Sequence, residues 1–346
     1  MMPVDSNFTN EIDILEDDLL NESSDVFRLL LKDHNTSKRN DKGEETEYHS
    51  IIWATDDYAY LGKGYTFYDE IKPELITGPE RGHIIQPRIN KEFHQQDARS
   101  KEMAEVFTPS WMCNEQNNLV DEAWFGRKNV FNEPSREGDN FPWIATSNPI
   151  TEFPEGKTWI DYVKANRLEI SCGEAPYLTS RYDTTTGIPI PIEQRIGLLD
   201  RKLRLVSENC NNSSQWLDYA RIAYQSTYGY EWQGDNLLLA REALYATFVE
   251  AYQHKFHRQP QNKSKRSIAY IISWNIWQMD GLRFVVPGSC HHGEHYQNLL
   301  GNESTIVCSG CQNGTFTGHI GTKCYVRDWR HKKPIDTPFI QCIKCK

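Results

Sequence analysis

Three short apolar runs in the middle of the chain have the pattern of strands in a parallel sheet. They span residues 167–170, 226–232 and 274–279. Stretches with apolar residues at helical spacing separate them, and one of these, residues 237–252, reads LLLAREALYATFVEAY. Strands that alternate with helices favour a parallel sheet with crossover helices. We therefore expect a Rossmann-type α/β domain over residues 101–287.

The segments on either side of this domain differ from it in composition. Residues 1–47 are acidic and polar, which predicts a largely disordered leader in which 12–20 and 26–31 could form short helices. The alternative is a segment that docks a partner or mimics nucleic-acid charge. Residues 48–100 predict a small α/β or β-rich subdomain. Residues 254–266 predict a basic linker, and residues 288–346, rich in Cys, His and Gly, a metal-stapled module.

The acidic charge is concentrated near the start of the chain. The 346 residues carry a net charge of −10, and residues 1–50 hold 13 acidic and five basic residues. The rest of the chain is therefore close to neutral, so a nucleic-acid partner is not excluded. Contacts with phosphates would come from local basic stretches such as residues 255–266.

No feature of the sequence predicts a membrane-bound or secreted protein. No apolar run approaches the roughly 18 residues that span a bilayer, and the first residues lack a signal-peptide pattern. The chain has nine cysteines, several of them in CxxC spacing. This usage favours metal binding in a reducing compartment over a disulfide framework. We expect a cytoplasmic protein without a membrane partner.

Four segments have the character of a nucleoside-cofactor site and follow one another in order. Residues 105–112 (EVFTPSWM) place an aromatic ring and a hydroxyl before a helix. Residues 169–178 (EISCGEAPYL) end the first strand in a loop of small residues. Residues 228–231 (YGYE) end the second strand with a carboxylate that suits ribose hydroxyls. Residues 275–282 (NIWQMDGL) end the third strand with an aspartate that could accept from an adenine amino group.

In this order the segments resemble the adenine-N6 DNA methyltransferases of restriction–modification systems, particularly type I modification subunits and type IIG, Eco57I-like enzymes. That family has a TP-containing segment, then DPACGTGxF, YGxE and a segment ending in D-x-L. Here EVFTP, EISCGEAPYL, YGYEWQGDNLLLAR and NIWQMDGL stand in these places, over roughly residues 100–285. Glu169 stands where the family has Asp, and Ala175 where it has the second glycine of the turn.

The expected fold class is therefore α/β: a Rossmann-like methyltransferase sheet, as the resemblance implies, with an N-terminal extension and a C-terminal zinc-binding module. The resemblance also implies S-adenosylmethionine as cofactor and DNA as partner. The residues that it places at the cofactor are Phe107, Thr108, Glu169, Cys172, Gly173, Glu231 and Asp280. The alternative is an α/β domain that binds another nucleotide or none.

The family's catalytic loop, (Asn/Asp/Ser)-Pro-Pro-(Tyr/Phe), has no clear counterpart, because the chain contains no Pro-Pro. The nearest strings are residues 147–150 (SNPI) and 336–339 (DTPF). The second, with Asp336 and Phe339 at its ends, lies downstream of the third strand, as the family's loop does. Two interpretations follow. The chain is one subunit of a split enzyme with a restriction or catalytic partner subunit, or it is a scaffold that binds DNA or a partner without methylating.

Cysteine and histidine spacing near the end of the chain, C-x2-C-x7-H-x4-C, suits a tetrahedral structural zinc. The ligands that we favour are Cys308, Cys311, His319 and Cys324. Cys342 and Cys345 are the alternative ligands: they could complete a four-cysteine site, or form a second site with Cys290 and a nearby histidine.

A nuclease is a third interpretation. Residues 70–72 (EIK) have the spacing of a nuclease carboxylate–lysine pair, and Asp56 and Asp57 lie upstream. Such a site would depend on a divalent metal ion.

Overall fold

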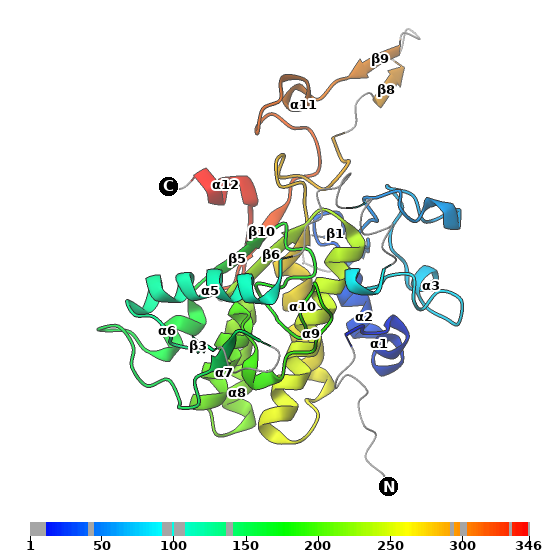
Figure 1. The fold of residues 1–346 in the computed structure, drawn as a ribbon. Helices are drawn as coiled ribbons and strands as arrows, with labels where there is room; N and C mark the ends of the chain where they lie inside the picture. Colours follow the sequence, from blue (N-terminus) through cyan, green and yellow to red (C-terminus); the bar gives the residue numbers. More distant parts are fainter. Residues whose placement is uncertain are drawn as a thin grey trace.

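The computed structural model describes residues 12–40, 45–91, 99, 108–135, 141–290, 294–297, 303–331 and 334–344. Its α-helices are α1 (Glu16–Glu22), α2 (Ser24–Leu31), α3 (Pro73–Ile76), α5 (Ser110–Phe125), α6 (Trp159–Lys164), α7 (Leu198–Asn209), α8 (Ser213–Gln225), α9 (Gly234–Phe256), α10 (Asn262–Asn275), α11 (Ser309–Asn313) and α12 (Phe339–Lys344). Its strands are β1 (Lys38–Arg39), β2 (Glu45–Glu47), β3 (Asn132–Pro134), β4 (Trp143–Ala145), β5 (Arg167–Ile170), β6 (Thr227–Glu231), β7 (Ile276–Gln278), β8 (Glu294–Gln297), β9 (Glu303–Ile306), β10 (Tyr325–Asp328) and β11 (Ile335–Pro338). Short 3-10 helices are η1 (Ala59–Leu61), η2 (Arg88–Asn90) and η3 (Ile192–Gln194). Figure 1 shows their arrangement.

The fold is mixed α/β, and a small parallel sheet with the strand order β5-β6-β7 lies at its centre. The three predicted strands are therefore present. Leu168 pairs with Tyr228 in the ladder, and Tyr230 pairs with Trp277. Because side chains alternate along a strand, the register fixes two faces. One face carries Leu168, Ile170, Tyr228, Tyr230 and Trp277, and the other carries Glu169, Gly229, Glu231, Ile276 and Gln278.

Different parts of the chain cover these two faces. On one face, Ile276 joins the main core, to which α2, α7, α8, α9 and α10 contribute. On the other face, Tyr230 and Trp277 join a smaller cluster with Phe339 of α12. The two-stranded β10–β11 sheet leads into this helix, so a hairpin and one short helix cover the second face.

The N-terminal segment differs from the predicted leader, because residues 12–40 are packed rather than disordered. The helices α1 and α2 overlap the two stretches expected to be helical, and Phe27, Leu30 and Leu31 of α2 are fully buried. The guanidinium of Arg241, on α9, donates to the carbonyls of Leu30 and Lys32 at 2.6 and 2.9 Å. These bonds satisfy carbonyls at the end of α2, and they tie the segment to the central helices.

Residues 48–91 also share the main core, so they do not form the separate subdomain that we predicted. Ile51 and Trp53 are fully buried in this core. The Gln278 side chain, on β7, accepts from the Ile52 N–H at 2.9 Å and donates to the Ile52 carbonyl at 2.8 Å. The Gln278 side-chain amide thus pairs with the backbone of Ile52 as a neighbouring strand would, beyond β7, the last strand of the sheet.

The predicted basic linker is mostly helical. The helix α9 continues to Phe256, and α10 begins at Asn262, so only a short turn remains between them. The helix α9 begins just after β6 and has 23 residues, which corresponds to a length of about 34 Å. The basic turn therefore lies far from the carboxyl end of β6, at the lower end of the molecule in Figure 1.

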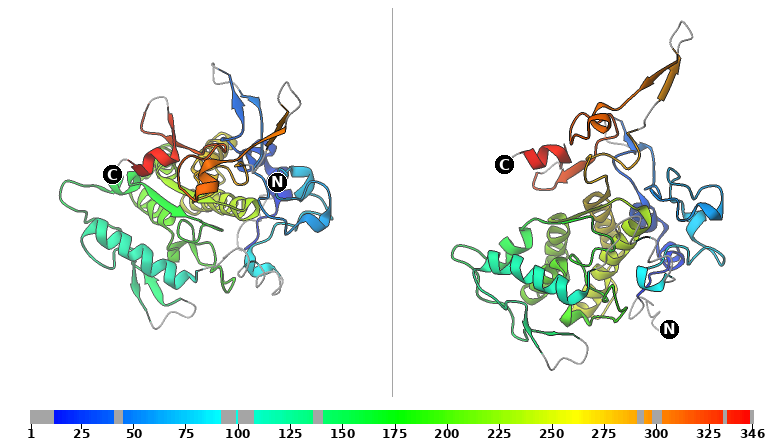
Figure 2. Two further views of the ribbon diagram at one scale, coloured as in Figure 1. Left: turned by 90° about the horizontal axis from the view of Figure 1, so that it is seen from above. Right: turned by 45° about the horizontal axis from the view of Figure 1, so that its top comes forward.

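The C-terminal module begins after β7 and returns to the sheet through β10. The backbone N–H of Val286 donates to the carbonyl of Thr322, and that of Cys324 donates to Phe284. Figure 2 shows that the β8–β9 hairpin of this module projects away from the rest of the molecule. Among the described helices, none combines the length and the apolar composition needed to cross a membrane.

Candidate functional site

The structure brings together several of the predicted cofactor residues at one edge of the parallel sheet. Because β5, β6 and β7 run in the same direction, their carboxyl ends meet at this edge. We call this place the carboxyl-edge site. Its residues are Glu169, Cys172, Gly173, Glu231 and Asp280.

The loop that follows β5 has an unusual backbone at this site. Ser171, Gly173 and Ala175 have φ angles of 48°, 52° and 61°. Positive φ strains residues other than glycine, and such strain occurs where a loop holds a ligand. The Gly173 N–H donates to Oε2 of Glu231 at 2.8 Å. The loop is thus fixed to the end of β6.

A close approach between β5's loop and β6 explains the glycine of YGYE. A Cβ atom at Gly229 would lie 3.3 Å from Sγ of Cys172 and 3.3 Å from Cδ1 of Ile276, tighter than most side-chain contacts. Cys172 is itself buried. The small residues at positions 172 and 229 therefore permit the loop to pack against the sheet.

The two glutamates of the site are buried but differ in their hydrogen bonds. Glu231 accepts from the N–H groups of Gly173 and Gln233, and burial raises its pKa although these bonds oppose the shift. Glu169 accepts from Tyr177 N–H at 3.4 Å, and its Oε2 has no hydrogen-bond partner in the described structure. Burial raises the pKa of Glu169 well above its usual value. A buried acceptor without a donor is costly, so this oxygen is suited to a ligand hydroxyl or amine.

Asp280 lies at the site but is engaged locally, and Thr108 lies beside Tyr177. Asp280 accepts from the N–H groups of Leu282 and Arg283 within its own turn, so these bonds already occupy one of its oxygens. The Thr108 side chain interacts with Tyr177, the residue whose N–H approaches Glu169. Phe107 lies outside the described residues.

A second site lies in the C-terminal module, where three cysteines and one histidine form a cluster. Its members are Cys290, Cys308, Cys311 and His319, and their ligand atoms all lie within 4.8 Å of one another. The Nδ1 atom of His319 is 3.6, 3.5 and 3.5 Å from the three sulfur atoms. We call this group the Cys3His cluster. It could bind a metal ion such as zinc.

The geometry of the Cys3His cluster fits a tetrahedral ion. A zinc ion with bonds of about 2.3 Å to sulfur and about 2.05 Å to nitrogen would hold these atoms about 3.6 Å apart. The other ring nitrogen of His319, Nε2, lies 2.7 Å from the carbonyl of Thr315. Donation from Nε2 to this carbonyl leaves the lone pair on Nδ1 towards the sulfurs, as metal-binding histidines require.

The acidity of one thiol, that of Cys308, and the size of a neighbouring residue also suit a metal. Burial opposes ionisation of Cys308, but hydrogen bonds from the backbone of Cys311 and Ile320 lower its pKa to about 6. Thiolates are the form that binds metals. A Cβ atom at Gly310 would lie 2.8 Å from Nδ1 of His319. Glycine between the two cysteines of the knuckle therefore lets the imidazole reach the sulfurs.

The Cys3His cluster differs from the predicted ligand set at one position. Cys308, Cys311 and His319 come together as the spacing predicts, but Cys290 takes the place that we gave to Cys324. Cys324 is buried against the sheet, and its thiol donates to the Gln278 carbonyl at 3.4 Å. The chain passes Cys324 as it returns to β10, which draws this residue away from the knuckle.

The alternative ligands also lie elsewhere. Cys342 is exposed on α12, outside the Cys3His cluster, and Cys345 lies outside the described residues. The spacing pattern offered Cys290 only as a ligand of a second site, whereas the structure places it with the knuckle. Its position beside His291 and His292 was the signal available in the sequence.

The segment predicted as a catalytic loop, residues 336–339, makes structural contacts and does not lie free at the carboxyl-edge site. Asp336 lies in β11 and accepts two hydrogen bonds from the Arg327 guanidinium at 2.7 and 2.8 Å. Phe339 begins α12 and packs its ring against Tyr230 and Trp277, with centroids 5.8 and 5.4 Å apart. Neither side chain is available to a substrate base in this arrangement.

The carboxylates of the nuclease interpretation are also engaged in local contacts. Glu70 lies 2.6 Å from Nδ1 of His49, and Asp57 pairs with Arg99 at 2.8 Å. Oδ1 of Asp56 accepts from the Phe67 N–H. In the described residues, the Cys3His cluster is the one group of metal-binding side chains that the structure brings together.

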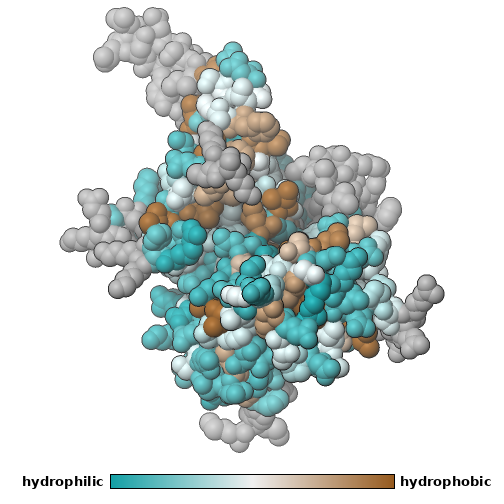
Figure 3. All heavy atoms as spheres, turned by 90° about the vertical axis from the view of Figure 1, so that its left-hand side faces the viewer, coloured by the Kyte–Doolittle hydropathy of each residue, from teal (hydrophilic) through white to brown (hydrophobic). Residues whose placement is uncertain are grey.

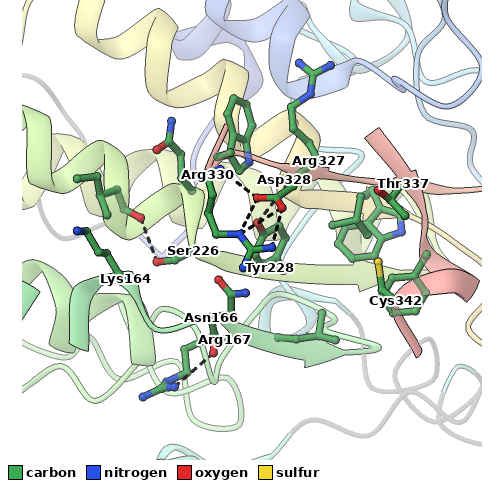
Figure 4. A pocket seen from close by; sticks show the side chains of 17 residues that line it. Lys164, Asn166, Arg167, Ser226, Tyr228, Arg327, Asp328, Arg330, Thr337 and Cys342 are labelled. Carbon is green, nitrogen blue, oxygen red and sulfur yellow. Dashed lines mark hydrogen bonds and ion pairs between the residues drawn. The ribbon is translucent and has the colours of Figure 1, made fainter. Parts of the chain in front are cut away.

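A pocket of about 760 Å³ lies away from the carboxyl-edge site, beside the amino ends of β5 and β6. Figure 4 shows Lys164, Arg167 and Tyr228 on the side of the sheet, and Arg327 and Cys342 on the side of the hairpin and α12. Cofactors of open α/β sheets bind at the carboxyl ends of the strands. The position of this pocket therefore makes it a poor candidate for the cofactor site.

Comparison with known proteins identifies no relative: no protein-family model, no curated protein and no solved structure matches this chain. Function must therefore be inferred from the two sites.

Proposed function

We propose that this protein is an S-adenosylmethionine-binding, adenine-N6 DNA-methyltransferase-like protein of a restriction–modification or phage-defence system. The observation that carries the proposal is the bond between Gly173 N–H and Glu231. It joins the loop of the SCGEAP motif to the carboxylate of the YGYE motif, at the carboxyl edge of a parallel sheet. Two motifs 58 residues apart thus meet where α/β proteins bind nucleosides.

In this proposal the residues of the carboxyl-edge site have separate roles. Glu231 accepts from the ribose hydroxyls, and the strained loop around Gly173 approaches the cofactor with its backbone. Oε2 of Glu169 accepts from a polar group of the cofactor, because it has no other donor in the described structure. The cofactor supplies an electrophilic methyl group, and the chain contributes binding and orientation rather than a strong base.

Methyl transfer to a base requires further groups that these 346 residues do not offer in the expected form. The chain has no Pro-Pro, and Asp336 and Phe339 are held by Arg327 and the aromatic cluster. A second candidate function is therefore a methyltransferase-like scaffold that binds DNA or a partner through its zinc module. The Cys3His cluster favours this alternative for the C-terminal module, because four protein ligands indicate a structural metal site rather than a catalytic one.

We propose zinc as the metal of the Cys3His cluster. Three thiolates and one imidazole suit zinc, and four protein ligands leave no open position for water, so the role is structural. The ion would join the turn after β7 to the knuckle of α11. It would thereby hold the module at the same end of the sheet as the carboxyl-edge site.

Calorimetric titration of the zinc-loaded protein tests the cofactor. We expect saturable binding of S-adenosylmethionine and of S-adenosylhomocysteine, which share the adenosyl and amino-acid groups. ATP and NAD should bind at least about tenfold more weakly, since their phosphates would approach two buried carboxylates. Binding of ATP or NAD in preference would replace the methyltransferase proposal with that of another nucleotide-binding domain.

A further inference from the structure

The outer edge of β5 is unpaired in the described part of the chain. β5 pairs with β6 on one side, and no described strand lies on its other side. The side chains of Leu168 and Ile170 are 45% and 65% exposed, although Tyr230 and Trp277 on the same face are 8% and 2% exposed. The apolar face thus becomes progressively uncovered from β7 to β5.

This edge has only some of the devices that protect natural edge strands. Such strands usually carry an inward-facing charge, a proline or a bulge. β5 has only four residues and an inward-facing carboxylate, Glu169, but it contains no proline and no break in register, and Leu168 and Ile170 are bare on its other face. Parallel sheets occur almost only with both faces covered. An open parallel edge with bare apolar side chains therefore indicates a surface that another polypeptide covers.

The pocket described above continues this surface. Leu168 of β5 and Tyr228 of β6 line it together with Phe339, and it opens beside the amino ends of the same strands. Figure 3 shows apolar side chains gathered at mid-height on this side of the molecule, above a largely hydrophilic helical layer. A helix that accompanies an added strand would lie on this face, as crossover helices do.

The strand order indicates what the covering polypeptide supplies. In open α/β sheets the ligand lies where the strand order reverses, between two halves of the sheet. Here the order β5-β6-β7 proceeds in one direction only within the described residues, so no described strand continues the sheet beyond β5 at the carboxyl-edge site. We infer that β5 receives a parallel strand from a partner polypeptide, whose following helix packs against Leu168 and Tyr228. This inference rests on the proposed function, because the location of the cofactor fixes the direction of the added strand.

A second copy of this chain does not meet the requirement. Two copies related by an axis normal to the sheet would pair their β5 edges antiparallel, and their carboxyl ends would then point in opposite directions. A strand that completes the site beyond β5 must have its carboxyl end at the same edge of the sheet as the carboxyl end of β5. The partner is accordingly a different polypeptide, with an apolar strand that ends in polar residues able to face the cofactor and a substrate base.

Site-specific photo-crosslinking in the native cells tests this inference. A photo-reactive amino acid replaces Leu168 or Ile170, and the matched control replaces Ile144, which is 53% exposed on β4. We expect both edge positions to crosslink to one apolar segment of one other polypeptide, and the control position not to do so. With that polypeptide purified, Ile170→Lys should weaken the complex by about 30-fold or more and Ile144→Lys should not.

Three results would overturn the inference: crosslinks within the same chain, crosslinks to a second copy, or a complex that Ile170→Lys does not weaken. Circular dichroism of each variant checks that the fold persists. The titration with S-adenosylmethionine is made on the isolated chain in parallel. If a partner binds the β5 edge but the isolated chain does not bind S-adenosylmethionine, the interface stands and the methyltransferase proposal fails. If the chain binds S-adenosylmethionine but no partner binds the β5 edge, the methyltransferase proposal stands and the interface fails.

Discussion

The Glu231→Ala variant is expected to bind S-adenosylmethionine at least about 100-fold more weakly than the wild type. Two hydrogen bonds from ribose hydroxyls to an ionised acceptor contribute about 3 kcal/mol, and each 1.4 kcal/mol corresponds to about tenfold in affinity. Calorimetric titration measures the change. Glu193→Ala is the control, because Glu193 is exposed and pairs with His254 at the surface.

The pH dependence of wild-type binding distinguishes a direct role of Glu231 from a structural one. Burial raises the pKa of this carboxyl above its usual value, and hydroxyl donors favour its ionised form. Affinity should therefore fall as the pH decreases and the carboxyl takes up a proton. In Glu231→Gln, which cannot ionise, this dependence should be much reduced. An unchanged pH profile in the Gln variant, or full affinity in the Ala variant, would contradict the assignment.

Loss of one ligand of the Cys3His cluster should remove the metal and disorder the module. We expect a single zinc ion per wild-type chain and none in Cys308→Ser or Cys290→Ser, because a structural site needs four protein ligands. The apparent metal affinity should fall by at least about 100-fold. Elemental analysis of the purified variants measures the metal, and limited proteolysis between residues 288 and 324 measures the order of the module.

Two further cysteines supply matched controls for this prediction. Cys324 is buried at the sheet and Cys342 is exposed on α12, and neither belongs to the Cys3His cluster. The variants Cys324→Ala and Cys342→Ser should both keep the zinc. Loss of zinc in Cys324→Ala with retention in Cys290→Ser would restore the ligand set that spacing alone predicted.

Local patterns predicted the central strands well. The run 167–170 coincides with β5, and the other two runs contain β6 and β7. β6 and β7 are short, largely apolar and buried, as strands of parallel sheets usually are, so their place is visible in the sequence. The knuckle of Cys308 and Cys311 was predictable for a similar reason, since both thiols lie on one turn.

Long-range packing was not visible in the same way. The acidic residues of α1 and α2 suggested disorder, but the apolar side of α2 packs on α10, and Arg241 fixes its carbonyls from a position more than 200 residues later. The choice between Cys290 and Cys324 likewise depends on how the chain folds back from β7. Spacing describes neighbours along the chain, and both features are set by contacts between distant segments.

The central claim is that S-adenosylmethionine binds at the carboxyl-edge site, and hydrogen exchange with and without the cofactor tests it most directly. The account predicts that saturating cofactor slows exchange of the amides in residues 171–178 and 231–233, and leaves those around the pocket at Arg327 and Tyr228 unchanged. Exchange that stays the same at the carboxyl-edge site, or slows only around that pocket, would contradict it.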